Sequence, residues 1–370
     1  MSADPAALAR QDDLFAPAFR VLQEGISRRV FPCASVAITA KGKLVGLRAF
    51  GQFTYAPDTP AATVGTPFDL ASLTKVVATT SALMILYERS QIRLDDRVVE
   101  FVPEFGSALP DSRRAEVTVH HLLAHTSGLP AYVKVFEFAH GREEVVHAAC
   151  SQPLEAAPGT RAEYSDIGFI LLGEIVSRVA GEELHAFCER EIFEPLAMSQ
   201  TRFCPPSEMR DSIPPTEIDE AFRHRIVQGE VHDENAWAMS GVAGHAGLFA
   251  TALDIARFAE CMLGGGNPIL RRETVERFTR RESNPLGTSR ALGWDTPSQP
   301  SQSGSYLSPQ SFGHLGFTGT SLWIDPVRDL SITLLTNRTW PNRESQDAIK
   351  QLRPRFHDAV VEALIQADNQ

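Results

Sequence analysis

β-rich segments lie near both ends of this 370-residue sequence, and helical patterns fill its middle. Residues 33–53 contain two such runs joined at residues 41–43, and residues 312–338 contain two more, separated by residues 325–329. Short polar turns between β-rich runs are typical of hairpins, and hairpins pair their strands antiparallel. The sequence therefore predicts an antiparallel sheet that both ends of the chain build together.

Apolar residues at helical spacing mark the segments expected to cover this sheet or to form a separate helical part. They lie at residues 14–29, 68–88, 166–181, 184–196, 250–263 and 344–366. We expect an α/β (α+β) fold, an antiparallel sheet flanked by helices. Residues 1–75 and 245–370 should form the sheet domain and residues 76–244 an inserted, mostly helical subdomain, with the active site in the cleft between them.

Composition narrows the function and the cellular location. The net charge is −11 and no basic run occurs, which argues against nucleic acid as a partner. The sequence shows neither a secretory signal nor an apolar run of about 18 residues that could span a membrane. The five cysteines form no CxxC pair, so reduced thiols and a cytoplasmic location are expected. The oligomeric state is left open.

Lys75 stands in the apolar segment 68–88, three residues after Ser72. In a helix this spacing puts both side chains on one face, where Ser72 Oγ and Lys75 Nζ can meet. Apolar surroundings should lower the pKa of the ammonium, and a neutral amine can take the serine proton. The alternatives are a chance Ser-x-x-Lys and a lysine that extends to solvent from a surface helix.

Two further stretches favour catalysis. Tyr164-Ser165-Asp166 comes just before a helical segment, and His314-Leu315-Gly316 begins a β-rich run. With Ser72-x-x-Lys75, these elements give the chain a resemblance to the serine β-lactamase and penicillin-binding-protein superfamily over about residues 20–340. It is most similar to the class C-like serine hydrolases, which include esterases, amidases and D-amino-acid peptidases. Residues 122–130, 158–166 and 241–251 add to the likeness.

The resemblance implies a role for each matching residue. Ser72 would be the acylated nucleophile, Lys75 its activating partner, and Tyr164 a second member of the proton network with a lowered phenol pKa. The backbone N–H groups of Ser72 and Phe317 would form the oxyanion hole. The remaining matching positions, expected to bind substrate, are Asp166, His314 and Gly316.

Two departures from the family pattern favour an esterase over a β-lactamase. Asp166 stands where many relatives have asparagine, which would add a negative charge beside the lysine, and His314 stands where penicillin-recognising members have lysine. An imidazole at residue 314 should be mostly neutral near pH 7.5 and gain charge toward pH 6, so anionic substrates would lack a permanent cation.

The sequence thus predicts a cofactor-free serine hydrolase of a small-molecule ester or amide, with a carboxylesterase as the first choice. The alternatives are a cell-wall-related amidase or D-amino-acid peptidase, a weak β-lactamase, and a peptidoglycan-binding protein that does not turn over. The spacing of His121 and His125 would suit a zinc site, but no HExxH pattern supports it, so no metal is expected. A polar cluster either lines the cleft or forms a buried network; it comprises His232, Asp233, Glu234 and His245.

Overall fold

The computed structural model describes residues 1–368 and contains a six-stranded sheet with the order β1-β3-β2-β11-β10-β9. The strands are β1 (Ser2–Ala3), β2 (Cys33–Ala40), β3 (Lys43–Gly51), β9 (Phe312–Leu315), β10 (Ser321–Asp325) and β11 (Leu330–Thr336). All neighbours pair antiparallel except β1 with β3. The central pair joins the two ends of the chain, since β2 and β11 run from Ala34 opposite Thr336 to Ala40 opposite Leu330. The predicted sheet is confirmed.

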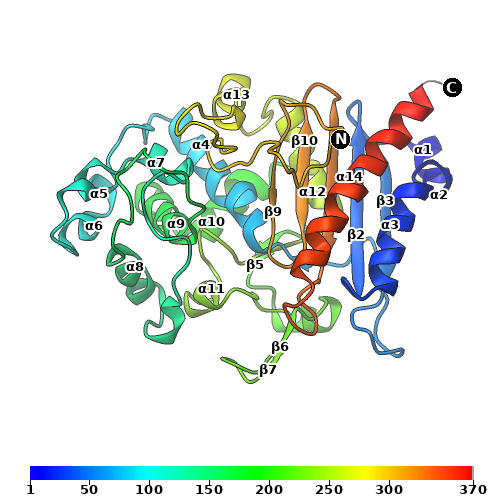
Figure 1. Ribbon diagram of the computed structural model, residues 1–370, viewed down its shortest axis with the longest axis horizontal. Coiled ribbons are helices and arrows are strands. Elements are labelled where there is room, and N and C mark those ends of the chain that lie inside the picture. Colours follow the sequence, from blue (N-terminus) through cyan, green and yellow to red (C-terminus); the bar gives the residue numbers. More distant parts are fainter. Residues whose placement is uncertain (369–370) are drawn as a thin grey trace.

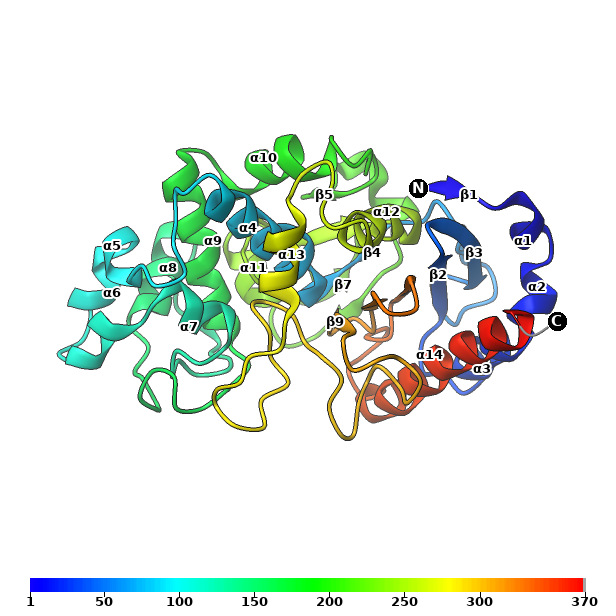
Figure 2. The same cartoon turned by 90° about the horizontal axis from the view of Figure 1, so that it is seen from above.

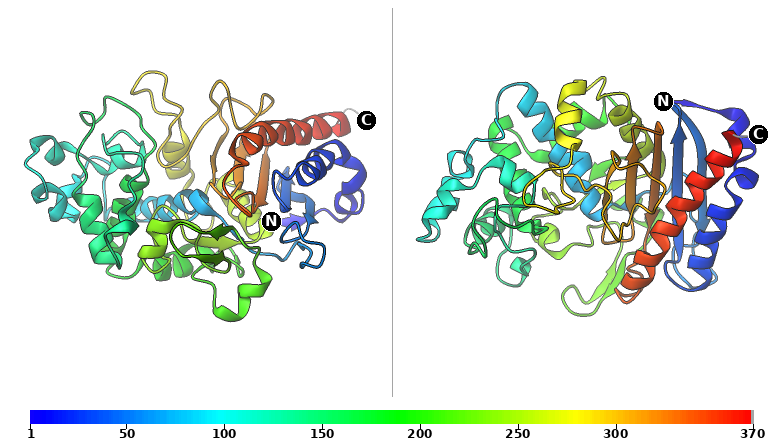
Figure 3. Two further views of the ribbon diagram at one scale, coloured as in Figure 1. Left: turned by 60° about the horizontal axis from the view of Figure 1, so that its bottom comes forward. Right: turned by 45° about the horizontal axis from the view of Figure 1, so that its top comes forward.

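Helices cover both faces of this sheet (Figures 1 and 2). Helices α3 (Ala16–Ser27) and α14 (Gln346–Asp368) lie side by side on one face, as the right view of Figure 3 shows, and α12 (Ala252–Leu263) packs on the other. Along β2, Val36 and Ile38 join the core under α3 and α14, whereas Ala37 joins the core on the opposite face. Burial on both faces explains why this strand is apolar throughout.

The remaining α-helices lie mostly beside the sheet, in the part drawn cyan and green in Figure 1. The long helix α9 (Asp166–Ala180) is buried over most of its length. It begins at Ser165, whose Oγ accepts from Gly168 N at 3.0 Å, and ends at Gly181 with a φ of 70°. The others are α1 (Pro5–Ala9), α2 (Gln11–Leu14), α4 (Ser81–Glu88), α5 (Val98–Phe101), α6 (Pro103–Ser107), α7 (Val119–Leu123), α8 (Arg142–Cys150), α10 (Leu184–Cys188), α11 (Glu234–Ala238) and α13 (Arg272–Thr279).

Two small sheets complete the structure. One has the order β4-β8-β5, formed by β4 (Phe68–Asp69), β8 (Leu248–Ala250) and β5 (Arg202–Phe203). The other is the hairpin of β6 (Glu217–Asp219) and β7 (Arg225–Val227), which projects from the lower edge of the molecule in Figure 1. Short 3₁₀-helices occupy Ala71–Leu73, Ser112–Glu116, Val135–Glu137 and Ser207–Ser212.

Segment 68–88 was predicted as one long helix, and this is wrong. The segment begins as strand β4, turns through Ala71–Leu73, continues as a π-helix over Lys75–Thr80, and becomes α-helical only in α4. Ala71 has a φ of 48°, a left-handed conformation that interrupts a regular helix and is uncommon outside glycine. Residues 184–196 likewise divide into α10 and a π-helix over Glu189–Phe193.

The division into segments 1–75 plus 245–370 and 76–244 stays a prediction, and its last residues, 369 and 370, lie outside the described part. Within residues 1–368, none of the helices combines the length and apolar character needed to cross a membrane.

Candidate active site

The turn that carries Ser72 is held by a buried carboxylate. Asp69, at the end of β4, accepts a hydrogen bond from Ala71 N at 2.8 Å and another from His232 N at 2.6 Å. Thr74 Oγ1 accepts from Leu248 N at 3.1 Å, which ties the next residues to β8. These contacts hold Ala71 in its left-handed conformation and fix where Ser72 leaves the strand.

Lys75 lies directly beneath Ser72, with its side chain fully buried. Its Nζ donates to Ser72 Oγ at 3.0 Å and to the carbonyl oxygen of His245 at 2.9 Å, and it lies 2.6 Å from Asp166 Oδ1. Two hydrogen-bond acceptors and a carboxylate thus surround the nitrogen with oxygen atoms. The contacts therefore suit a charged lysine.

Electrostatics agrees with this charge state. Burial lowers the pKa of Lys75, but the Asp166 carboxylate and the Tyr164 phenol outweigh burial, so the lysine pKa is raised above its ordinary value. The predicted neutral amine is wrong, because the carboxylate of Asp166, expected as a negative charge beside the lysine, outweighs the burial from which the lowered pKa was inferred. Asp166 thus contacts Lys75 and also lines the large cavity, and its role in binding substrate stays a prediction.

Tyr164 completes this group from the end of the segment before α9. The Lys75 ammonium lies 5.0 Å from the centre of the Tyr164 ring, and Lys75 and Ser72 both hydrogen-bond the phenol. Burial raises the pKa of Tyr164; Lys75 lowers it, but not enough to offset burial and the neighbouring Asp166. The predicted lowering is therefore wrong, and the phenol is protonated at neutral pH.

The charge on Asp166 gives a testable consequence. Asp166→Asn removes the carboxylate that raises the pKa of Lys75, so the lysine should lose its proton at lower pH. We expect the acid limb of kcat/KM against pH to move toward lower pH by about one unit or more, with activity retained. Asp12→Asn, an exposed change on α2, is the control. An unmoved acid limb would show that the ion pair does not set the protonation of the catalytic group.

The edge strand β9 lies against the nucleophile turn. Thr318 Oγ1 donates to the carbonyl oxygen of Asp69 at 2.8 Å, and Thr320 Oγ1 donates to that of Leu70 at 2.9 Å. Gly316 is closely packed here, since a Cβ on it would lie 2.5 Å from the carbonyl oxygen of Leu70. These contacts pack the segment that carries Phe317 against the turn that carries Ser72, and the oxyanion hole of Ser72 and Phe317 stays a prediction.

His314, on β9, is buried and neutral. Its Nδ1 lies 2.8 Å from the carbonyl oxygen of Leu315, so Nδ1 carries the proton and Nε2 is left as an acceptor. Burial, with the nearby Lys75 and Arg290, holds the pKa of His314 well below its ordinary value. The expectation that His314 gains charge toward pH 6 is therefore wrong.

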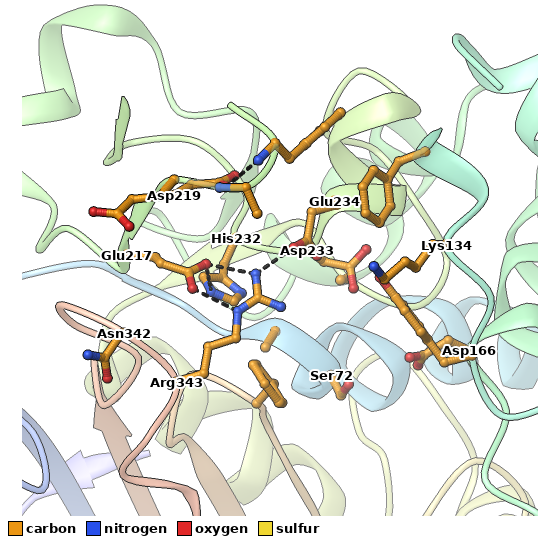
Figure 4. A pocket seen from close by; sticks show the side chains of 18 of the residues that line it. Ser72, Lys134, Asp166, Glu217, Asp219, His232, Asp233, Glu234, Asn342 and Arg343 are labelled. Carbon is orange, nitrogen blue, oxygen red and sulfur yellow. Dashed lines mark hydrogen bonds and ion pairs between the residues drawn. The ribbon is translucent and has the colours of Figure 1, made fainter. Parts of the chain in front are cut away.

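Two cavities meet at the nucleophile, and Ser72, Tyr164 and Phe317 line both. The large cavity, about 870 Å³, lies between the β6–β7 hairpin, α11 and the segment around residues 132–137 (Figure 4). The small cavity, about 330 Å³, lies between β9 and α14 and is lined by the cationic side chains Arg290, Arg338, Lys350 and Arg353, with Asp295 as its carboxylate.

The polar cluster left open by the sequence lines the large cavity and is also internally paired. His232 Nε2 lies 3.0 Å from Glu217 Oε2, and His245 Nε2 lies 2.8 Å from Asp233 Oδ1. His232, Asp233 and Glu234 face the cavity, whereas His245 is buried behind it and presents its carbonyl oxygen to Lys75. The cluster therefore lines the cleft with three of its residues and also forms a partly buried network.

The two histidines considered as zinc ligands have structural contacts instead. His121 Nδ1 accepts from Thr118 N at 3.2 Å at the start of α7, and His125 Nδ1 accepts from Ser165 N at 3.0 Å. No group of three potential metal ligands occurs within residues 1–368.

Sequence reasoning missed Asp69 and the cations of the small cavity. Arg290 comes from a loop after α13, whereas Lys350 and Arg353 belong to α14. No motif near these residues marks them, and only the folded chain brings them to Ser72.

Comparisons with known proteins show the family of this chain. The family model described as "Beta-lactamase" matches residues 18–354. A protein of Escherichia coli (strain K12) named "Putative D-alanyl-D-alanine carboxypeptidase" is 34% identical over 306 residues, which cover 75% of this chain and 70% of that protein. The structure of EstCE1, described as a hydrolase with promiscuous acyltransferase activity, has a TM-score of 0.74 at 22% identity and covers 95% of this chain and 99% of its own. A class C beta lactamase from Rhodobacter sphaeroides has a TM-score of 0.72 at 20% identity, covering 94% and 99% of the two chains. The chain belongs to the β-lactamase family and is a serine hydrolase of that family.

Proposed function

We propose that this serine hydrolase cleaves an ester or amide through an acyl-enzyme on Ser72, with carboxylester hydrolysis as its main reaction. The observation that carries the proposal is the placement of Ser72 Oγ, which is 3.0 Å from the buried Lys75 Nζ and faces both cavities. Two cavities at one nucleophile can hold the acyl part and the leaving part of a substrate at the same time.

The charge state of Lys75 sets the order of proton transfers. The ammonium, held 2.6 Å from the Asp166 carboxylate, first loses a proton to solvent, and the resulting amine takes the proton of Ser72. Ser72 Oγ then forms a bond to the substrate carbonyl carbon, and the carbonyl oxygen becomes an oxyanion between the N–H groups of Ser72 and Phe317.

Collapse of this intermediate needs a proton on the leaving atom. The protonated Tyr164 phenol donates it as the bond to the leaving oxygen or nitrogen breaks, and Lys75 returns a proton to Tyr164. A water molecule then attacks the acyl carbon and gives a proton to the Lys75 amine. Lys75 passes this proton to Ser72 Oγ as the bond between Oγ and the acyl carbon breaks, which releases the acid and restores Ser72.

A second function, a D-amino-acid carboxypeptidase, is favoured by the small cavity. Arg353 is buried there, and burial lowers its pKa to about 9. Its Nη2 donates to the carbonyl oxygens of Gly316 and Thr320, and no carboxylate lies within ion-pair distance among residues 1–368. A carboxylate on the leaving part would compensate this charge. Arg353 can thus supply the cation that anionic substrates were expected to lack because His314 is neutral.

Turnover of a matched pair of esters separates these functions. Phenyl acetate and 3-carboxyphenyl acetate differ only in the carboxylate, and N-acetyl-D-Ala-D-Ala adds the amide. An esterase should hydrolyse the neutral ester at least as well as the anionic one and leave the peptide intact. A carboxypeptidase should cleave the peptide and favour the anionic ester by about ten- to a hundredfold, the range for a charge-assisted hydrogen bond. A single burst without steady turnover of any of the three would contradict both functions.

A further inference from the structure

The two cavities that meet at Ser72 have opposite charge. The small cavity is lined mainly by cations, as described above. The large cavity is lined by many more carboxylates than cations. Its cations are Lys134 and Arg343, and its carboxylates are Glu137, Asp166, Glu217, Asp219, Glu220, Asp233 and Glu234. Figure 4 shows several of these carboxylates on different sides of the same space, with Ser72 at its base.

The cations in the wall do not balance this charge. Lys134 pairs with Glu137, and two cations behind the wall pair with its carboxylates, Lys75 with Asp166 and Arg223 with Asp219. Arg343 Nη2 contacts both Glu217 and Glu234, so one guanidinium serves two carboxylates. Glu220, in the turn of the β6–β7 hairpin, is exposed and has no cation within 4.0 Å among residues 1–368. The wall therefore has a net negative charge, and a cavity with low-dielectric walls concentrates such a field.

Two carboxylates of the large cavity are held in their ionised form. Burial raises the pKa of Glu217, but hydrogen bonds from His232 and Arg343 outweigh it and bring the pKa to about 2. Burial also raises the pKa of Asp233, and His245 with the N–H of Ala236 outweighs it, so this pKa too lies below its ordinary value. The negative charge of the cavity consequently persists throughout the neutral range.

Aromatic side chains line the same cavity. Tyr132 is 41% exposed there, and the rings of Phe136 and Phe222 have centres 4.6 Å apart. Phe222 is held from behind by Trp237, with ring centres 5.3 Å apart. Aromatic faces together with carboxylates are the surroundings in which proteins bind ammonium and guanidinium groups.

We propose that the part of the substrate that occupies the large cavity carries a positive charge, in the form of an ammonium or guanidinium group. The inference rests on the proposed acylation of Ser72, since it assumes that this cavity holds one of the two parts of the substrate. Membership of the family does not by itself imply that the substrate carries a positive charge. The arrangement selects for a substrate that is cationic on one side of the scissile bond.

Esters that differ only in one charged atom test this selection. On the acyl side, p-nitrophenyl 4-(trimethylammonio)butyrate is paired with p-nitrophenyl 5,5-dimethylhexanoate, in which carbon replaces the charged nitrogen. On the leaving side, 3-(trimethylammonio)phenyl acetate is paired with 3-tert-butylphenyl acetate. Each ratio of kcat/KM is divided by the ratio of the hydroxide-catalysed rates, which removes intrinsic reactivity. We expect the cationic ester to be favoured by about tenfold or more in one series, with the preference declining between 0.05 and 0.5 M salt.

Two double variants connect the preference to this cavity. Glu137→Gln with Glu220→Gln removes two rim carboxylates and should reduce the ratio of kcat/KM for the cationic ester to that for the neutral ester by about threefold or more. Glu273→Gln with Glu276→Gln makes the same change of net charge on the exposed surface of α13 and should leave the preference unaltered.

Different results would refute the proposed function and the cationic substrate. Absence of an acyl adduct on Ser72, or of any ester turnover, would refute the proposed function. Turnover through Ser72 with no preference for the cationic ester in either series would overturn the cationic substrate alone, as would an equal loss of preference in both double variants.

Discussion

Ser72→Ala is expected to lower kcat on p-nitrophenyl butyrate by at least about a thousandfold, because loss of a covalent nucleophile removes the acyl-enzyme pathway itself. What remains would be direct attack of water assisted by the oxyanion hole. The same substitution should abolish the single adduct that a fluorophosphonate forms with the wild-type chain. Intact-mass measurement and mapping of the labelled peptide check both statements.

A control variant separates loss of chemistry from loss of folding. Ser199→Ala changes an exposed serine remote from Ser72 and should retain wild-type turnover and labelling. The Ser72→Ala protein should unfold at nearly the wild-type Tm, since Ser72 contributes little to the core. An adduct on another serine, or residual kcat above a thousandth of wild type, would mean that a different residue is acylated.

Much of the sheet could be predicted because local turns specify it. The tight connection at residues 41–43 fixes the pairing of β2 with β3, and residues 325–329 do the same for β10 with β11. Segment 68–88 was mispredicted because its shape depends on distant contacts. Asp69 accepts from the backbone of His232, far away in the sequence, and this bond helps to hold the left-handed Ala71. A pattern of apolar residues contains no information about such a bond.

The active site shows the same difference between what local sequence predicts and what distant contacts decide. Ser72 and Lys75 could be paired from their spacing, and their side chains do meet. The protonation of Lys75 could not be predicted, because it depends on whether the charge of Asp166, expected near the lysine, outweighs burial, and the 2.6 Å contact that decides this appears only in the folded chain. The charge of the small cavity depends on Arg290 and Arg353, which different segments contribute. Motifs thus identify the residues that react, whereas tertiary contacts set the charge around them.

Lys75→Arg is expected to be almost inactive, with kcat/KM on p-nitrophenyl butyrate and the fluorophosphonate labelling rate each reduced by about a thousandfold or more. Arginine keeps its proton at usable pH, so it cannot take the proton of Ser72. Its planar fork also differs from the compact ammonium that now donates to Ser72 Oγ and the carbonyl oxygen of His245. Lys43→Arg, an exposed change at the start of β3, is the matched control and should keep full activity.

The result also decides how the proton leaves Ser72. If Lys75 carries the proton, Lys75→Arg should remain inactive at every accessible pH, because no amine can form. If Lys75 acts only as a fixed positive charge beside Tyr164 and Asp166, the guanidinium should replace it, and activity above about a tenth of wild type should persist. In that second case the proton would have to pass from Ser72 to Tyr164 directly. The raised pKa of the Tyr164 phenol argues against this route, since a protonated phenol cannot accept the proton at neutral pH.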